Sequence, residues 1–169
     1  MVFWMQIITI IINIYISFTE NKKRIYIALF LQNLAQLLLY GFNNDLTTTL
    51  IYVVILIRSV FCVYKDRFKT DLIPYSIINI QLLIGCFTME NSLQLLPIFI
   101  SCYSCWYLWF YNDTQKLRIG NIIANTAWAV YNLCTGLYII LIMRVITVGS
   151  NFIAYIKRKN ELLKVAIQI

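Results

Sequence analysis

Long apolar segments joined by very short loops are the feature that most constrains how this chain can fold. Seven such segments lie at 2–18, 24–42, 45–64, 72–89, 93–111, 117–135 and 137–156. An α-helix needs about 17–25 residues of this kind to cross a bilayer. The chain is 61% hydrophobic and 12% charged, whereas soluble domains are about 25% charged. Because 169 residues enclose too little interior to hide this surplus, the sequence predicts an all-α polytopic membrane protein with seven transmembrane helices.

The basic residues predict how these helices are oriented. Loops 20–24, 65–71 and 112–118 and the segment after residue 156 hold twelve of the 14 Lys and Arg residues. The N-terminus and the loops near 43–45, 89–92 and 135–137 hold none. Cytoplasmic loops collect Lys and Arg, so we expect the N-terminus outside and the C-terminus in the cytoplasm. This placement also accounts for the net charge of +7, and we expect a lipid bilayer rather than nucleic acid as the partner.

An internal repeat divides the chain. Adding 92 to a residue number places the first three segments on the last three: 2–18 falls on 94–110, 24–42 on 116–134 and 45–64 on 137–156. The sequence thus predicts a three-helix bundle at 1–66, a linker helix at 67–91, a second bundle at 92–159 and a tail at 160–169. A repeat distance of four helices makes the two halves parallel. Parallel repeats are related by an axis along the membrane normal and bind substrates at their interface.

Polar side chains follow matching faces of the second and sixth segments. On the sixth they are Asn121, Asn125, Trp128 and Asn132, spaced i, i+4, i+7 and i+11 along one helical face. The equivalent positions of the second segment are Leu29, Asn33, Gln36 and Tyr40. Two interpretations stay open: a cavity for a neutral polar solute such as a sugar or nucleoside, or hydrogen bonds that hold the helices together. We expect Asn121 to lie too near the inner surface to contact a solute.

Two arginines lie inside the apolar segments. Such charges are candidates for function. Arg58 lies about two turns before Lys65, so we expect its side chain to extend toward the inner surface. Arg144 is closer to the middle of its segment and shares a face with Thr147 and Asn151. Since Asp45, at the outer end of its segment, is the sole acid in these segments, we expect Arg144 to pair with backbone carbonyls, with Tyr52 or with an anionic ligand.

Several classes of chemistry lack the residues that they need. The chain has no His, which removes the commonest general base, and shows no paired carboxylates or metal cluster; we therefore expect neither an enzyme nor a cofactor. Proton-driven transporters use Asp, Glu or His within their helices, and a phosphate-binding loop is also missing. Facilitated diffusion is the mode that remains. The five cysteines all lie in apolar segments, and we expect them to pack as small residues rather than to form disulfides.

Scattered residues resemble the YgjV-type family of bacterial inner-membrane proteins. The resemblance covers roughly 24–158 and rests, in the second half, on Leu95-Leu96-Pro97, Trp106, Arg118, Trp128, Asn132, Gly136 and Asn151. In the first half it rests on Arg58, followed by an apolar run and Lys65. This family is similar to the 3-1-3 proteins of the SWEET and PQ-loop type.

The resemblance implies roles for four residues. Prolines near helix ends act in gating in the broader group, which implies Pro97; Asn and Trp residues contact the solute, which implies Trp128, Asn132 and Asn151. The chain departs from the family pattern in two ways: Arg144 stands in a helix whose early part usually carries an acid, and Met5 stands where a paired proline is expected.

The leading hypothesis from the sequence is a facilitator of a small neutral polar metabolite. The alternative is a non-transporting membrane protein that binds lipid or protein partners. The residues expected to line a solute site are Asn33, Gln36, Tyr40, Asn125, Trp128, Asn132, Arg144 and Asn151. The sequence leaves the oligomeric state open, including a homo-oligomer.

Overall fold

A computed structural model describes residues 2–42, 46–68, 70–89 and 91–167 of the chain. Within these ranges the chain forms seven α-helices and no strand. The helices are α1 (Val2–Phe18), α2 (Lys22–Phe42), α3 (Leu46–Val63), α4 (Leu72–Thr88), α5 (Leu95–Phe110), α6 (Thr114–Cys134) and α7 (Tyr138–Ile167). Two short 3₁₀ turns, Lys65–Arg67 and Ser92–Gln94, precede α4 and α5. Each predicted apolar segment therefore corresponds to one helix.

Local sequence signals set the helix ends. The carboxylate of Asp113 accepts a hydrogen bond from the backbone N–H of Gln115 (3.0 Å) and caps the start of α6. The turn between α6 and α7 contains Gly136, whose φ of 73° suits glycine. α7 continues to Ile167, so the last predicted apolar segment, 137–156, covers the first part of a longer helix, and the predicted tail at 160–169 is helical as far as the structure describes it. Arg158 and Glu161, three residues apart, form an ion pair of 3.1 Å on this extension.

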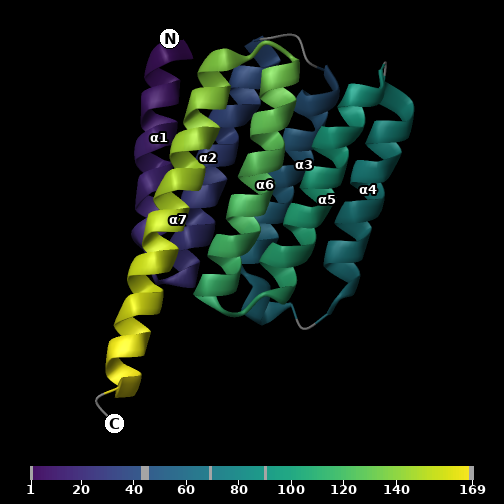
Figure 1. Cartoon of the computed structure of the whole chain (residues 1–169). Helices are drawn as coiled ribbons and strands as arrows, with labels where there is room; N and C mark the ends of the chain where they lie inside the picture. The colour runs from purple at the N-terminus through teal and green to yellow at the C-terminus, as the bar shows by residue number, and fades with distance from the viewer. Residues whose placement is uncertain (1, 43–45, 69, 90, 168–169) are drawn as a thin grey trace.

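Four helical segments have the length and hydropathy to cross a membrane: Lys22–Phe42, Leu46–Val63, Ser92–Phe110 and Tyr138–Glu161. α1 and α4 are apolar but shorter, with 17 residues each. α6 has 21 residues and is long enough, but its amides lower its hydropathy. All seven helices run side by side in one bundle (Figure 1).

Neighbours along the chain are neighbours in space. Each helix packs against the next, α3 also packs against α5, and α1 packs against α7, which closes the ring. α4 contacts only α3 and α5 among the stronger packing partners and stands at the edge of the bundle (Figure 1). The packing contacts of the two halves thus correspond. The contacts of the first half are α1–α2, α2–α3 and α3–α5, and their counterparts in the second half are α5–α6, α6–α7 and α7–α1.

Polarity is distributed as in a protein dissolved in lipid. Large apolar side chains such as Trp4, Ile11, Phe87 and Phe99 are 62–85% exposed. Amides, hydroxyls and three arginines lie inside, including Gln36, Asn132 and Thr147 at 0–1% exposure. Water would reverse this arrangement, whereas lipid tails favour it because only the interior of the bundle offers partners to polar groups.

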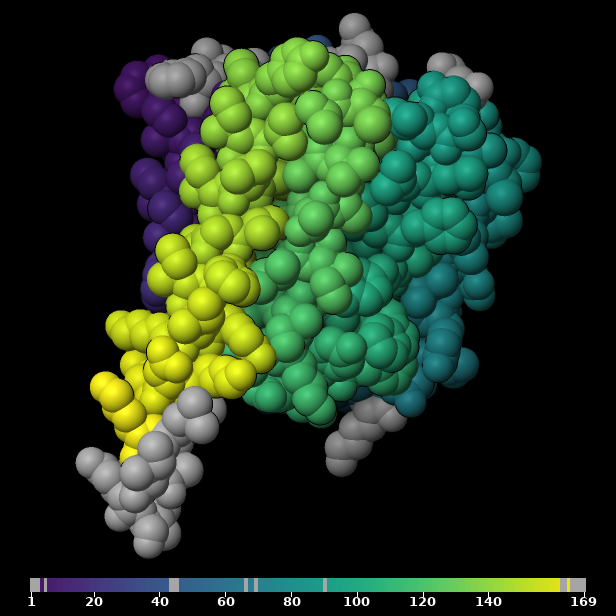
Figure 2. Space-filling view, in the orientation of Figure 1, coloured from purple at the N-terminus to yellow at the C-terminus, as the bar shows by residue number. Residues whose placement is uncertain are grey.

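One end of the bundle, here called the basic end, holds the loops after α1, α3 and α5. α7 projects beyond the bundle at this end, as the space-filling view shows (Figure 2). The N-terminal side of α1 lies at the opposite end (Figure 1). The loop at 43–45, with Asp45, and Glu90 were expected at the opposite end and lie outside the described residues.

Candidate functional site

Arg144 forms the centre of a buried polar network. Its guanidinium donates to Asn125 Oδ1 (3.0 Å), Gln36 Oε1 (3.2 Å) and Tyr52 OH (2.7 Å). The guanidinium carbon also lies 5.3 Å from the centre of the Trp128 ring, in cation–π range. Arg144 is 4% exposed, and four helices (α2, α3, α6 and α7) meet on its side chain. The expected pairing with Tyr52 is confirmed.

An aromatic cluster closes the bundle between Arg144 and the opposite end. Tyr40 and Tyr52 stack with ring centres 5.2 Å apart, and Trp128 lies 5.9 Å and 5.5 Å from them. Tyr131 packs on Trp128 at 5.8 Å. All four are at most 5% exposed. The four rings therefore form one packed aromatic cluster in the interior of the bundle.

A central cavity lies on the other side of Arg144. It holds about 40 Å³, room for about three water molecules. Its polar lining comes from α2, α3, α5, α6 and α7: Gln32, Asn33, Tyr52, Arg58, Ser104, Asn121, Asn125 and Arg144, with Trp128 beside them. A smaller cavity of about 20 Å³ shares Leu29 and Asn121 with it and continues to Thr114 and Arg118 near the basic end. The two cavities therefore adjoin each other, and the smaller one lies toward the basic end.

Arg58 faces the same cavity as Arg144. It is 4% exposed, and one terminal nitrogen reaches the carbonyl oxygen of Ser101 at 3.4 Å. The expectation that it extends to the surface is wrong, because α5 and α6 cover it. Arg58 follows Tyr52, the partner of Arg144, by six residues on α3, about 9 Å along the helix axis, and both arginines line the cavity.

The charge of the two arginines is not balanced nearby. Among the side chains that line the cavity none is acidic. The acids whose side chains the structure describes, Glu20, Asp71, Asp113 and Glu161, all lie in loops or helix ends at the basic end. The Nε atoms of Arg58 and Arg144 and the Oε1 atom of Gln32 are buried without a hydrogen-bond partner in the described structure. Arginine stays protonated in proteins, so the cavity carries two positive charges.

The structure brings four predicted site residues to the cavity: Asn33, Asn125, Trp128 and Arg144. Asn33 donates to Ser59 Oγ (3.1 Å), and Asn125 donates to Asn121. Asn33 and Asn125 therefore do not bond each other. Asn121 lines the cavity as well, so the expectation that it lies too near the surface is wrong.

Four other predicted residues lie outside the cavity. Tyr40 donates to Asn132 Oδ1 (2.8 Å) within the closed part of the bundle, where Gln36 bonds Arg144. Asn151 lines the smaller cavity, and its side-chain nitrogen donates to the carbonyl of Thr147 (2.8 Å). The helical faces predicted from the sequence therefore identified which polar groups are buried. They did not identify which of these groups line a cavity.

Pro97 is buried in the first turn of α5, where its missing N–H costs no helical hydrogen bond. It lines neither the central nor the smaller cavity. Its gating role stays a prediction.

The sequence analysis did not include Gln32, Arg58 and Ser59 among the site residues. It named Tyr52 only as a possible partner of Arg144, although Tyr52 also lines the cavity. The repeat register held a signal for Tyr52: the hydrogen-bonded pairs Tyr40–Asn132 and Tyr52–Arg144 are each separated by 92 residues. Equivalent positions of two repeats touch only near the axis that relates them. Nothing in the sequence indicated Gln32, which lies beside Asn33 but was not on the predicted face.

All five cysteines are free thiols; Cys62 and Cys105 are buried, but Cys86 and Cys134 are exposed, so the expectation that all five pack as small residues is wrong for these two. No group of three metal-binding side chains occurs among the described residues.

Comparison with known proteins places the chain in one family. No curated protein and no solved structure matches the chain. A model of the Imp-YgjV family, described as bacterial inner membrane protein, matches residues 3–161. This match extends over all seven helices, from α1 into the projecting part of α7, and confirms the resemblance found in the sequence. The chain belongs to the YgjV family of bacterial inner membrane proteins.

Proposed function

We propose that this protein is a facilitative transporter of a small polar metabolite that carries an anionic group, a carboxylate or a phosphate. The observation that carries the proposal is the composition of the central cavity. Its lining includes two buried guanidinium groups and no acidic side chain. Buried charges in membrane helices normally pair with each other, and an anion from outside the chain is the partner that would complete this site.

The composition of the cavity supports this class of solute. Arg144 and Arg58 each have a buried Nε–H without a partner, and guanidinium groups bind carboxylates and phosphates in a planar, two-pronged geometry. Asn33 and Asn125 offer amides for neutral polar groups of the same solute. The neutral sugar- or nucleoside-like solute that the sequence favoured would leave both charges unpaired.

The proposal includes a topology. All seven helices cross the membrane, the N-terminus lies outside, and the basic end faces the cytoplasm because it carries the Lys and Arg residues of the loops. The halves α1–α3 and α5–α7 form two parallel bundles that α4 joins in a 3-1-3 order. The matching helix contacts of the halves and the two hydrogen bonds across 92 residues support this arrangement.

A conformational change is part of the mechanism. About 40 Å³ accommodates a few waters but no metabolite. We infer that the basic end opens from this state, because the smaller cavity extends from the central one toward Thr114 and Arg118, and that the aromatic cluster keeps the other side closed. Alternating access would then require Tyr40, Tyr52 and Trp128 to separate.

Uptake into liposomes under a membrane potential tests the proposal and the class of solute. The purified protein is reconstituted, and labelled short-chain monocarboxylates, inorganic phosphate, glucose and uridine are offered with the interior held 100 mV positive or at zero. A singly charged anion gains about 2.3 kcal/mol per 100 mV, a roughly fiftyfold accumulation ratio. We expect saturable, voltage-dependent uptake of one of the anions.

Other outcomes identify the alternatives. Saturable uptake of glucose or uridine that ignores the potential would support the neutral solute. No uptake above protein-free liposomes would favour the non-transporting membrane protein, in which the amides serve only as helix contacts. Thiol labelling of single cysteines adds a check: position 33 or 125 should react in the cysteine-free background with a reagent applied from the basic end, and position 40 or 132 should not.

A further inference from the structure

A surface pocket at the basic end lies at the seam where the end of α1 meets α6 and α7. Here called the entrance pocket, it holds about 120 Å³. Its charged lining residues are Glu20, Arg118, Lys157, Arg158 and Glu161. Because Glu20, Lys157 and Glu161 are exposed, the pocket lies at the surface of the protein.

Shared lining residues connect the entrance pocket to the central cavity. Arg118 lines both the entrance pocket and the smaller cavity. The smaller cavity in turn shares Leu29 and Asn121 with the central cavity, which Arg144 lines. The three spaces therefore follow one another from the surface at the basic end to the buried network of Arg144.

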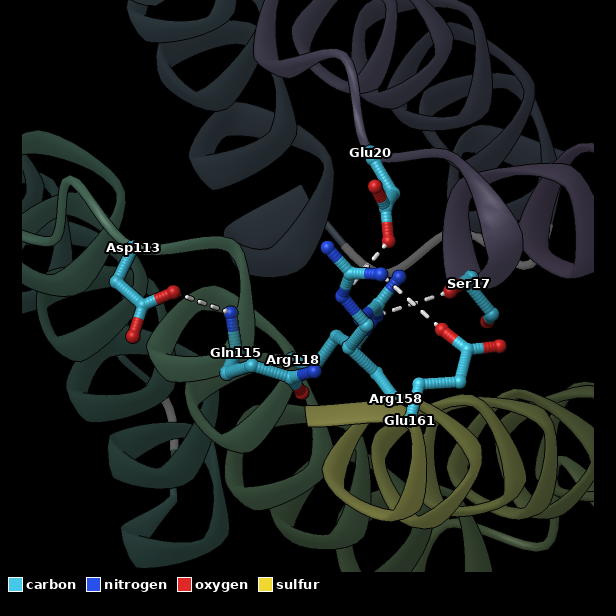
Figure 3. Close-up of polar contacts among 7 residues, drawn as sticks. All are labelled: Ser17, Glu20, Asp113, Gln115, Arg118, Arg158 and Glu161. Atoms are coloured by element: carbon cyan, nitrogen blue, oxygen red, sulfur yellow. Dashed lines mark hydrogen bonds and ion pairs between the residues drawn. The ribbon is translucent and has the colours of Figure 1, made fainter. Parts of the chain in front are cut away.

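Polar contacts hold the seam together beside this pocket. Arg118 Nε on α6 donates to the carbonyl oxygen of Ser17 at the end of α1 (3.0 Å). Arg158 Nε on α7 lies 3.2 Å from Glu20 Oε1, and its NH1 atom lies 3.1 Å from Glu161 Oε2 (Figure 3). Ser17 and Glu20 belong to the first half of the chain. Separation of the two halves at this end would therefore release both guanidinium groups from their first-half partners.

Arg118 is suited to bind an anion at this point. It is 6% exposed, and its attraction to an anion is stronger away from bulk water. The bond to Ser17 uses one of the five N–H donors of the guanidinium group, so the same side chain can hold a carboxylate or a phosphate. Arg158 provides a second guanidinium group in the same pocket.

We propose that the entrance pocket is the site at which the anionic group of the solute binds on its way to the central cavity. Arg118 binds this group, and the group competes with the Glu20 carboxylate for Arg158. Because the Glu20–Arg158 ion pair joins the two halves, an anion that replaces Glu20 favours the open seam. The inference rests on the proposed function for the nature of the solute.

The rate of thiol labelling behind Arg118 tests the inference and does not require transport. Leu29→Cys is introduced into the full-length protein without its native cysteines, because Leu29 lines both inner cavities. Membrane vesicles that expose the basic end are treated with two membrane-impermeant thiol reagents of similar size, one bearing a sulfonate and the other an ammonium group. The quantity compared between variants is the ratio of the sulfonate rate to the ammonium rate, in which the intrinsic reactivities of the reagents cancel.

Arg118→Gln should lower this ratio. One positive charge about 4 Å from the path changes the local concentration of a singly charged reagent about fivefold. Loss of that charge slows the sulfonate reagent and speeds the ammonium reagent, so the ratio should fall about 25-fold. Arg118→Lys keeps the charge and should retain most of the ratio.

Arg24→Gln is the matched control, because Arg24 is an exposed arginine at the same end and lines neither the entrance pocket nor the smaller cavity. Its rate ratio should equal that of the protein with all its arginines. An equal fall in the control and in Arg118→Gln would reduce the effect to net charge and overturn the assignment.

Two further variants keep the test decisive if Arg118→Gln does not fold. The side chain of Arg158 is 39% exposed, so Arg158→Gln leaves the interior intact, and it should lower the ratio in the same direction. Glu20→Gln removes the carboxylate that competes with the anion. Exposed ion pairs of this kind contribute up to about 1 kcal/mol, so sulfonate labelling should become up to about fivefold faster. An unchanged ratio in Arg158→Gln, or sulfonate labelling that does not become faster in Glu20→Gln, would overturn the proposal.

Liposome uptake separates this inference from the proposed function. Labelling whose charge preference depends on Arg118, without uptake of any anion, would support the anion site and refute the transporter. Voltage-dependent uptake of an anion, together with the same rate ratio before and after Arg118→Gln, would support the transporter and overturn this entrance.

Discussion

Replacing Arg144 by methionine tests whether this residue binds a solute or only stabilises the folded protein. Methionine is close in length and apolar, so it fills most of the space of the side chain and removes the charge and its donors. Tyr52 and Asn125 lose a bond but still border the central cavity, where water can replace the guanidinium as their partner. Gln36 loses its bond in the closed part of the bundle.

The structure provides the magnitude. Arg144 donates three hydrogen bonds, to Asn125, Gln36 and Tyr52, and makes one cation–π contact. Hydrogen bonds between membrane helices contribute about 0.6 kcal/mol each, and the cation–π contact contributes about 1 kcal/mol. Together these contacts stabilise the protein by roughly 3 kcal/mol. Against this, a positive charge at the centre of a membrane helix costs about 2.5–3.5 kcal/mol. The two terms nearly cancel. We therefore expect Arg144→Met to change the free energy of unfolding by less than about 1.5 kcal/mol while anion uptake is lost.

The assay combines denaturant unfolding in mixed micelles with liposome uptake, measured on the same preparations. Arg144→Lys is the comparison, because it keeps the charge but not the planar fork that reaches three acceptors; it should retain weak uptake. A loss of more than about 3 kcal/mol in Arg144→Met would refute the reasoning, since the network would then be structural and Arg144 would need no solute to explain it. Unchanged uptake would refute it as well.

Three further predictions concern packing, the closed part of the bundle and the second arginine. Gly120→Ala should destabilise by about 1–3 kcal/mol, because its Cβ would lie 2.6 Å from the Tyr107 ring, whereas Gly149→Ala, with nothing within 4 Å, should be neutral or stabilising in the same unfolding assay. Tyr40→Phe combined with Asn132→Leu in a double-mutant cycle should give a coupling of about 0.6–1.7 kcal/mol, and no coupling would contradict the 2.8 Å bond. Arg58→Leu should abolish voltage-dependent anion uptake, and wild-type uptake in that variant would remove Arg58 from the site.

Much of the architecture followed from the sequence because hydropathy and loop charge are local properties. Each apolar segment became one helix, and matched polar positions on the second and sixth segments became buried groups on α2 and α6. The full length of α7 did not follow from hydropathy, because charged residues stop a membrane segment without stopping a helix. The site followed less well. Arg58 was expected to extend toward the inner surface because it lies about two turns before Lys65. That spacing carries no information on whether α5 covers the side chain.

The sequence by itself determined that this chain is a bundle of apolar helices with basic loops at one end, because those properties depend on residues close together in the chain. The spacing of 92 was also visible in it. Only the tertiary structure decided which equivalent positions meet, as Tyr52 meets Arg144, and that Arg58 and Arg144 border one cavity without an acid. Whether a buried polar group finds a partner, borders empty space or remains unpaired depends on side chains from helices far apart in sequence, and these distances exist only after the helices have packed.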